Sequence, residues 1–313
     1  MDYQKFLGTY EFACFCDDLE MKLRELFSAA LPGASLQRQW IDKLQGESYL
    51  SFTVRPEDST IGINLNVSDL YGSELEARGS VSPDRIGELA AGLLQITVGR
   101  LGSIPRIDLE LTDNYEKAKS RIITQLVAVR GNEEMLKTIP YRQIEDLAVV
   151  YRLFLNGESG IETCLINSSM LEDYGVTPEK LHQDAMENVS AVGQVTIKDL
   201  RELLKDLTGE ETDLPEPQGS RLFCLGTELK YFGASAILYP GVLARCAEKL
   251  GGSFYLLPSS VHEMLLLKDD GTIDPECLGS MIYEVNRATV DPSDRLTDHA
   301  YYYNCGSKEF YSV

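Results

Sequence analysis

The sequence lacks a long hydrophobic run. Its longest apolar stretches, residues 234–239 and 264–267, fall far short of the roughly 18 residues that a membrane span requires. The N-terminus, MDYQKFLGTYEF, carries acidic residues where an export signal needs a basic start followed by an apolar run. These absences predict a protein without a membrane span or an export signal, located in the cytoplasm.

Positive charge is also scarce. The chain has 29 Lys and Arg residues against 49 Asp and Glu residues, a formal net charge of −20. Its summed field therefore repels nucleic-acid phosphates and anionic lipid. The densest basic stretch, Lys117, Lys119, Arg121 and Arg130, has Glu116 beside it and is typical of a solvated helix face. We expect neither nucleic acid nor a membrane as a partner.

Clustered cysteines are missing as well. The seven cysteines are odd in number and do not have the even, close spacing of a disulfide framework. Cys14 and Cys16 form a C-x-C pair, but a zinc site needs about four ligands and no second pair completes it. We therefore expect reduced, structural thiols and no cofactor.

Apolar residues are plentiful, at 43% of the chain, and can fill a core. In the first part, helical spacing covers residues 12–30, 83–98 and 114–129, the last with Ile122, Ile123, Leu126 and Val129 facing inward. Strand patterns cover residues 35–44, 48–55 and 61–67, where IGINLNV alternates strictly. The strands predict a small antiparallel sheet with one wet face.

The later part contains strand patterns that arrive mostly in pairs. They cover residues 147–155, 162–167, 221–225, 234–238, 254–257, 264–267, 301–303 and 309–313. Helix starts at Thr177, at Thr196-x-x-Asp199, at Pro240 and at Asp274-Pro275 lie between them.

These patterns predict an α+β fold with antiparallel sheets and helices packed on one face. We expect two lobes, residues 1–138 and 139–313, with a boundary at Ile139-Pro140. Residues 208–220 are polar and rich in Pro, Gly and Glu, and we expect them to form the most mobile loop.

Four segments carry a family resemblance: DLAVVYRLFL, YGVTPEKLHQDAMENV, GASAILYPGVLARCAEKLGGSFYLLPSSVHEMLLL and MIYEVNRATVDPSDRLTDHAYYY. Together with INLNVSDLY (Ile63 to Tyr71), they resemble a domain-of-unknown-function family found mainly in gut clostridia. The middle and residues 233–267 are more remotely similar to the YtpQ-like proteins of bacilli. The resemblance implies a bacterial, cytoplasmic α+β protein and brings no catalytic residue; the YtpQ-like pattern has no histidine where His262 stands.

The first candidate site is LPSSVHE, which follows an apolar strand pattern. A serine, Ser259 or Ser260, is a possible nucleophile, with His262 as its base and Glu263 or a distant acid orienting the ring. No G-x-S-x-G motif supports this, and Ser260 and His262 need not face each other. The alternative, which we favour, is that Ser259 caps a helical turn and His262 makes a structural hydrogen bond.

Two weaker candidates lie near the C-terminal end. Glu284, Asp298 and His299 offer oxygen and nitrogen ligands for a divalent metal ion, although an exposed helix face followed by an acidic turn explains the same residues and is the interpretation we favour. Tyrosines are common at binding interfaces and equally common on half-exposed strands. These tyrosines are Tyr301, Tyr302, Tyr303 and Tyr311.

No segment has the specificity of a recognised catalytic, metal or nucleotide motif. The favoured hypothesis is a non-enzymatic protein that binds another protein or a peptide. The alternatives are a hydrolase or metal-dependent enzyme around Ser260, His262 and Glu263, and a subunit of a larger assembly that self-associates.

Overall fold

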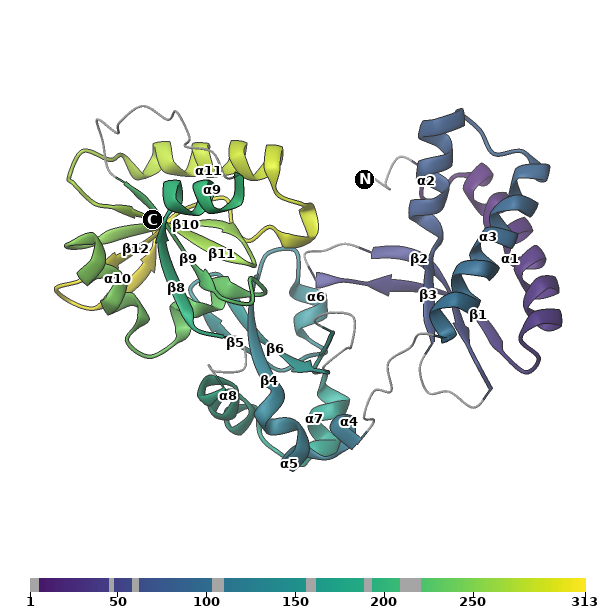
Figure 1. The fold of residues 1–313 in the computed structure, drawn as a ribbon, viewed down its shortest axis with the longest axis horizontal. Helices are drawn as coiled ribbons and strands as arrows, with labels where there is room; N and C mark the ends of the chain where they lie inside the picture. The colour runs from purple at the N-terminus through teal and green to yellow at the C-terminus, as the bar shows by residue number, and fades with distance from the viewer. Residues whose placement is uncertain are drawn as a thin grey trace. The chain divides into compact units, whose positions relative to one another are not determined.

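The computed structural model of the chain describes residues 6–44, 48–57, 62–102, 110–155, 162–188, 193–208 and 221–313. The chain forms two compact units, Met1–Arg106 and Ile107–Val313, which are drawn in Figure 1. None of the helices in the described ranges combines the length and apolar character needed to cross a bilayer. The loop expected at residues 208–220 lies outside the described residues, apart from its first position.

The first unit is one antiparallel sheet, in the order β1-β2-β3, with helices on one face. Its elements are α1 (Tyr10–Ala30), β1 (Ser35–Asp42), β2 (Ser48–Arg55), β3 (Ile63–Asn66), α2 (Val67–Arg78) and α3 (Pro83–Gly102). The other face is polar: Gln39 donates to Thr53 Oγ1 at 2.7 Å, and Thr53 donates to Asn64 Oδ1 at 2.6 Å. This is the wet face that the alternating strands predicted.

Helix α1 forms because its apolar residues recur every three or four positions and its first turn is capped. The Thr9 hydroxyl accepts the Phe12 N–H at 3.2 Å. The buried residues form one stripe against the sheet: Phe12, Phe15, Cys16, Leu19, Leu23 and Phe27. Thr9 thus starts the helix slightly earlier than the apolar spacing alone indicated.

The second unit contains two antiparallel sheets. The four-stranded sheet comprises β4 (Ile122–Ala128), β6 (Leu147–Phe154), β5 (Tyr141–Ile144) and β7 (Thr163–Leu165), with β6 in the middle. The six-stranded sheet runs β13 (Glu309–Ser312), β12 (Tyr301–Asn304), β10 (Phe254–Ser260), β11 (Glu263–Lys268), β9 (Leu222–Thr227), β8 (Val195–Asp199). The α+β class with antiparallel sheets is confirmed.

Helices and short helical turns connect these strands. Those before β8 are α4 (Glu110–Asp113), α5 (Tyr115–Ala118), η3 (Lys119–Arg121), α6 (Glu133–Leu136), α7 (Ser168–Tyr174) and α8 (Pro178–Glu187). Those after it are α9 (Leu200–Thr208), η5 (Gly233–Leu238), α10 (Val242–Leu250), α11 (Pro275–Thr289) and η6 (Pro292–Asp294). One continuous core joins the two sheets with α8, α10 and η5, while α11 packs on β10 through Leu278 and Ile282.

The structure differs from the sequence-based expectation at residues 114–129. The expected helix is confined to α5 and η3, and β4 follows. All seven residues of β4 are buried, so both faces are covered, and the spacing of Ile122, Ile123 and Leu126 arises from a fully apolar strand. Because β4 pairs with β6, the division between the units falls before β4 and not at Ile139-Pro140.

Two further segments differ in secondary structure from the sequence-based expectation. Residues 234–238, expected as a strand, belong to the helical turn η5, whose backbone packs against Val261 through the Ala234 N–H. Thr196 to Asp199, expected as a helix start, form most of β8, and the helix begins at Leu200. Alternation of β-branched and polar residues in VTIKD is the strand signal that the capping pattern obscured.

Candidate functional site

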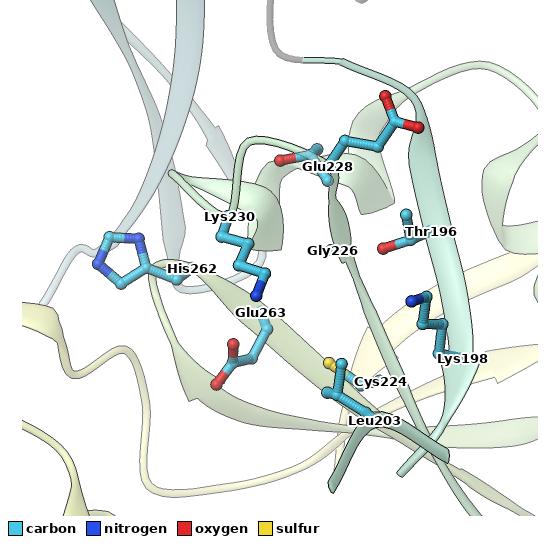
Figure 2. Close-up of a pocket in the computed structure, with 10 residues that line it drawn as sticks. Thr196, Lys198, Leu203, Cys224, Gly226, Glu228, Lys230, His262 and Glu263 are labelled. Atoms are coloured by element: carbon cyan, nitrogen blue, oxygen red, sulfur yellow. The ribbon is translucent and has the colours of Figure 1, made fainter. Parts of the chain in front are cut away.

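A pocket of about 330 Å³ opens at the β8 end of the six-stranded sheet (Figure 2). Its floor comes from β9 and β11, one wall from β8 and α9, and its rim from the turn that follows β9. Besides Leu203 and Cys224, the pocket is lined by polar side chains and one glycine: Thr196, Lys198, Gly226, Thr227, Glu228, Lys230, His262 and Glu263. His262 and Glu263 are therefore the two sequence candidates that reach this pocket.

Two glycines shape the floor. A Cβ on Gly233 would lie 2.4 Å from the His262 carbonyl oxygen and 2.9 Å from the Thr227 nitrogen, so only glycine allows η5 to approach the strands this closely. At Gly226, which lines the pocket, a Cβ would lie at an ordinary distance of 3.6 Å from the same oxygen. Gly226 therefore leaves space in the pocket, whereas Gly233 is required by packing.

The polar lining places two ammonium groups in the pocket. Figure 2 shows the side chains of Lys198 and Lys230 turned toward its middle. The Glu228 carboxylate points away from it and accepts the Gln194 N–H at 3.1 Å. The hydroxyl of Thr227 is buried and has no hydrogen-bond partner in the described part of the chain. A buried hydroxyl without a partner is costly to the fold.

The rim of the pocket has unusual backbone geometry. Lys230 and Phe232 have φ values of +56° and +51°, in the left-handed region that side chains other than Gly, Asn and Asp seldom adopt. The Lys230 N–H donates to the Thr227 carbonyl at 3.0 Å, which closes the turn. Strained backbone of this kind is concentrated at ligand-binding sites.

His262 is held at both ring nitrogens. Its Nδ1 accepts the Phe232 N–H at 3.3 Å, and its Nε2 lies 3.6 Å from Asp294 Oδ2. The ring also stacks on Phe232, and Figure 2 shows it pointing away from the pocket. Because Nδ1 already accepts a hydrogen bond, no lone pair is left to take a proton from a serine. This geometry matches the structural alternative for His262.

Neither serine faces the imidazole ring as a nucleophile would. Ser260 Oγ accepts the backbone N–H of His262 at 3.1 Å, and the Ser259 hydroxyl donates to Glu263 Oε1 at 3.3 Å. Both serines lie at the end of β10, where the ladder with β11 contains a bulge, so Ser259 caps no helical turn. The four candidates are neighbours that stabilise a strand connection, without a nucleophile–base contact among them.

The candidate metal ligands do not converge. Glu284 lies on the exposed face of α11, and Asp298 and His299 lie in the segment before β12. His299 Nε2 instead faces Asp146 Oδ2 at 3.4 Å. Within the described ranges, no group of three or more His, Cys, Asp or Glu side chains is arranged to hold a metal ion.

The tyrosines of β12 alternate between two environments. Tyr301 and Tyr303 are buried in the core between the sheets, and the half-buried Tyr302 donates to Asp269 at 2.8 Å. On β13, Tyr311 is exposed. Alternation along a strand explains why two of the four residues support the core and are not open for binding.

Strand β8 is an edge of its sheet, and its backbone faces two ways. The Gln194 carbonyl accepts the Glu228 N–H at 3.0 Å, so alternate positions 196 and 198 direct their backbone groups toward β9. Val195, Ile197 and Asp199 direct theirs outward, in agreement with the bond from Lys249 Nζ to the Ile197 carbonyl. In the described part of the chain, no strand pairs with this outer edge.

A second hollow of about 420 Å³ lies on the other face of β8. It is lined by Ile197 of β8 and by Arg245, Glu248 and Lys249 of α10. Thr196 and Lys198 face the first pocket, so successive residues of β8 border opposite hollows. This arrangement was not predicted from the sequence, because residues 196–199 were expected to start a helix.

The cysteine that reaches the pocket is not reactive. Cys224 is buried on β9, and desolvation raises the pKa of its thiol to about 12. A thiol with so high a pKa is protonated at neutral pH and is a poor nucleophile. The sulfur therefore serves as a small apolar group in the pocket floor.

Comparison with known proteins identifies a family of unknown function. A model described as "Family of unknown function (DUF5688)" matches residues 12–305. No curated protein and no solved structure matches the chain. The expected resemblance to a family of unknown function is thereby confirmed, while the clostridial source and the similarity to YtpQ-like proteins stay predictions.

Proposed function

This chain belongs to the DUF5688 family of unknown function, and we propose that it works as a binding protein for another polypeptide. In this proposal, an extended acidic segment of the partner adds to the six-stranded sheet as a further strand along β8. The observation that carries the proposal is the outer edge of β8, which pairs with no strand among the described residues and has a hollow on each face.

Strand addition uses the outward backbone groups of β8 for affinity and the hollows on its two faces for specificity. The outward N–H groups of Val195, Ile197 and Asp199 and the outward C=O group of Val195 supply main-chain hydrogen bonds that do not depend on the partner's sequence, while the Ile197 carbonyl already accepts Lys249 Nζ. Alternate side chains of the added strand enter the two hollows, and these contacts select the partner.

Charge favours an acidic segment. The first pocket holds Lys198 and Lys230, and the second hollow holds Arg245 and Lys249. Glu228 and Glu263 in the first pocket and Glu248 in the second hollow keep their negative charges, although Glu228 accepts the Gln194 N–H and Glu263 accepts the Ser259 hydroxyl. In a chain with a net charge of −20, four basic groups against three acidic groups make the two hollows together slightly positive, which favours an acidic partner at β8.

We propose the bacterial cytoplasm as the setting. All seven cysteines have free thiols, as a reducing compartment requires. Desolvation raises the pKa of the buried Cys16 and Cys246 thiols to about 12, which keeps them protonated. These thiols support the compartment and are independent of the β8 edge.

The test uses a fluorescein-labelled peptide of alternating valine and glutamate. A labelled peptide of alternating valine and lysine is its control. Anisotropy is expected to rise with the acidic peptide only. Replacing Val195 by Pro removes an outward N–H while leaving the Thr196 and Lys198 backbone bonds to β9 intact, so affinity falls about tenfold or more.

Two controls separate docking from folding. Val195→Ala keeps the N–H and is expected to bind like the wild type, and circular dichroism must show the same fold for both variants. The double variant Lys198→Glu and Lys230→Glu is expected to lose the acidic peptide and gain the lysine peptide. Equal binding by Val195→Pro, or no preference between the peptides in the wild type, overturns the proposal.

A further inference from the structure

A separate cavity of about 520 Å³ lies in the second unit, between β5, α8, η5, α10 and β13. It shares no lining residue with either hollow beside β8. Most of its wall is apolar, and the polar groups come from β5 and α8. The apolar lining residues are Ile144, Met186, Ile237, Leu238, Leu243 and Phe310.

The polar end of the cavity is built around His182. Its Nδ1 is 2.9 Å from the Tyr151 hydroxyl. Burial raises the pKa of Tyr151, so the hydroxyl keeps its hydrogen, and it donates to Nδ1 in the tautomer of His182 that is protonated at Nε2, the tautomer taken for this proposal. The neutral imidazole therefore carries its own hydrogen on Nε2, which has no partner among the described residues. In this tautomer, His182 presents one N–H donor where it lines the cavity.

Arg142 adds a positive charge at the same end. Burial lowers the pKa of His182, and the charge of the Arg142 guanidinium lowers it further, so the ring is neutral at pH 7. No carboxylate in the described part of the chain forms an ion pair with Arg142. A guanidinium and an imidazole N–H beside one cavity match the two oxygens of a carboxylate.

Glu145 also lines the cavity, and its negative charge would repel a carboxylate bound beside it. Its Oε2 accepts hydrogen bonds from the Ser312 N–H at 3.3 Å and from the Ser312 hydroxyl at 3.2 Å. Glu145 is therefore held toward β13, whereas Arg142 acts on His182. Arg142 and Glu145 therefore carry opposite charges at two ends of the same cavity. Replacing each in turn tests which end binds the head group of a ligand.

We propose that this cavity binds a small organic acid with one carboxylate and an unbranched or aromatic apolar body, of the size of a medium-chain fatty acid. The carboxylate bonds to the Arg142 guanidinium and to the Nε2–H of His182. The apolar body displaces water from Ile237, Leu238, Leu243 and Phe310. Nothing in this assignment depends on peptide binding at β8.

The experiment measures binding of octanoate, octanol and octylamine to the full chain by isothermal titration calorimetry. The three probes share one apolar body and differ in the head group. Octanoate is expected to bind about tenfold more tightly than octanol, and octylamine more weakly than either. Nitrogen NMR of the His182 ring gives an independent readout, because only a head group bound at Nε2 shifts that signal.

The variants test the polar end directly. Arg142→Gln is expected to reduce octanoate affinity to that of octanol and to leave octanol binding unchanged. Glu145→Gln removes a negative charge from the same cavity and is expected to keep or raise octanoate affinity. Equal affinity for octanoate and octanol in the wild type, or an unchanged octanoate affinity in Arg142→Gln, overturns the assignment. Val195→Pro is expected to bind octanoate normally, so failure here and failure at β8 are distinguishable.

Discussion

Tyr301 donates its hydroxyl hydrogen to Asp146 Oδ1 at 2.5 Å, although the two residues are 155 positions apart. Tyr301 belongs to β12 of the six-stranded sheet, and Asp146 lies in the turn between β5 and β6 of the four-stranded sheet. His299 Nε2 faces the other carboxylate oxygen at 3.4 Å. One carboxylate therefore ties the end of one sheet to a turn of the other.

The first prediction concerns this bond. Tyr301→Phe is expected to lower the free energy of unfolding by about 1–2 kcal/mol, because a buried hydroxyl bonded to a carboxylate is lost. Tyr302→Phe is the matched control and is expected to cost less, since Tyr302 is half-buried whereas Tyr301 is fully buried. Urea unfolding followed by circular dichroism measures both. An equal cost for the two variants would contradict the role assigned to Tyr301.

The second prediction is a loss of stability at alkaline pH. Burial raises the pKa of three thiols to about 12, those of Cys16, Cys224 and Cys246. Burial also raises the pKa of four tyrosines, Tyr115, Tyr151, Tyr174 and Tyr301. The unfolded chain releases these protons near pH 8.5 for cysteine and about pH 10 for tyrosine, before the folded chain does. The contribution is complete below about pH 8.5 and falls as the pH rises.

Urea midpoints measured at increasing pH test that direction. The ultraviolet absorbance of tyrosinate is expected to rise in two stages, with the buried tyrosines ionising only when the chain unfolds. A urea midpoint that is constant up to about pH 11 would show that these groups ionise alike in both states.

The third prediction concerns acid. Glu74 is 8% exposed and accepts two bonds from Arg85, at 2.9 Å and 2.7 Å. The hydrogen bonds from Arg85, opposed by burial and aided by the Arg85 and Arg78 charges, lower the pKa of Glu74. Its contribution is therefore present above the unfolded pKa of about 4.3 and is lost as the pH falls through the lower folded value.

Glu74→Gln is expected to be less stable at neutral pH and to lose less stability on acidification. Fluorescence of Trp40, the one tryptophan in the sequence, reports unfolding of the first unit, where Glu74 lies. Glu88→Gln is the control, because Glu88 bonds Arg85 from an exposed position. The same acid sensitivity in Glu74→Gln and the wild type would argue against a lowered pKa at Glu74.

The fourth prediction compares two glycines. Gly233→Ala is expected to destabilise the fold by about 1–3 kcal/mol, because its Cβ would lie 2.4 Å from the His262 carbonyl oxygen and the backbone must shift. Gly226→Ala meets that oxygen at 3.6 Å and is expected to change stability by less than about 1 kcal/mol. Thermal unfolding measures both variants, and a similar loss at the two positions would contradict the packing described for η5.

The elements predicted correctly are those whose signal is local. Thr9, Thr177 and Asp274 accept N–H groups at the starts of α1, α8 and α11, and apolar spacing follows each cap. β4 was missed because a strand covered on both faces has no alternation, and its Ile and Leu spacing imitates a helix. Only pairing with β6, which is distant in sequence, determines its state.

The candidate site was also predicted only in part, because some of its residues have a local sequence signal and others meet only through strand pairing. His262 and Glu263 were identified because they follow a recognisable apolar strand. Lys198 and Thr227 reach the same pocket only through the pairing of β8 with β9, which sequence spacing does not reveal. The hydrogen bond from the Phe232 N–H, which occupies His262 Nδ1, likewise comes from a turn 30 residues away.

Hydrogen exchange at β8 tests the proposed strand addition most directly. With the acidic peptide bound, the amides of Val195, Ile197 and Asp199 are expected to exchange more slowly. These three N–H groups point away from β9 and would bond to the added strand. Those of Thr196 and Lys198, which face β9, are expected to change little. Peptide binding that leaves the three outward amides unprotected would contradict the account.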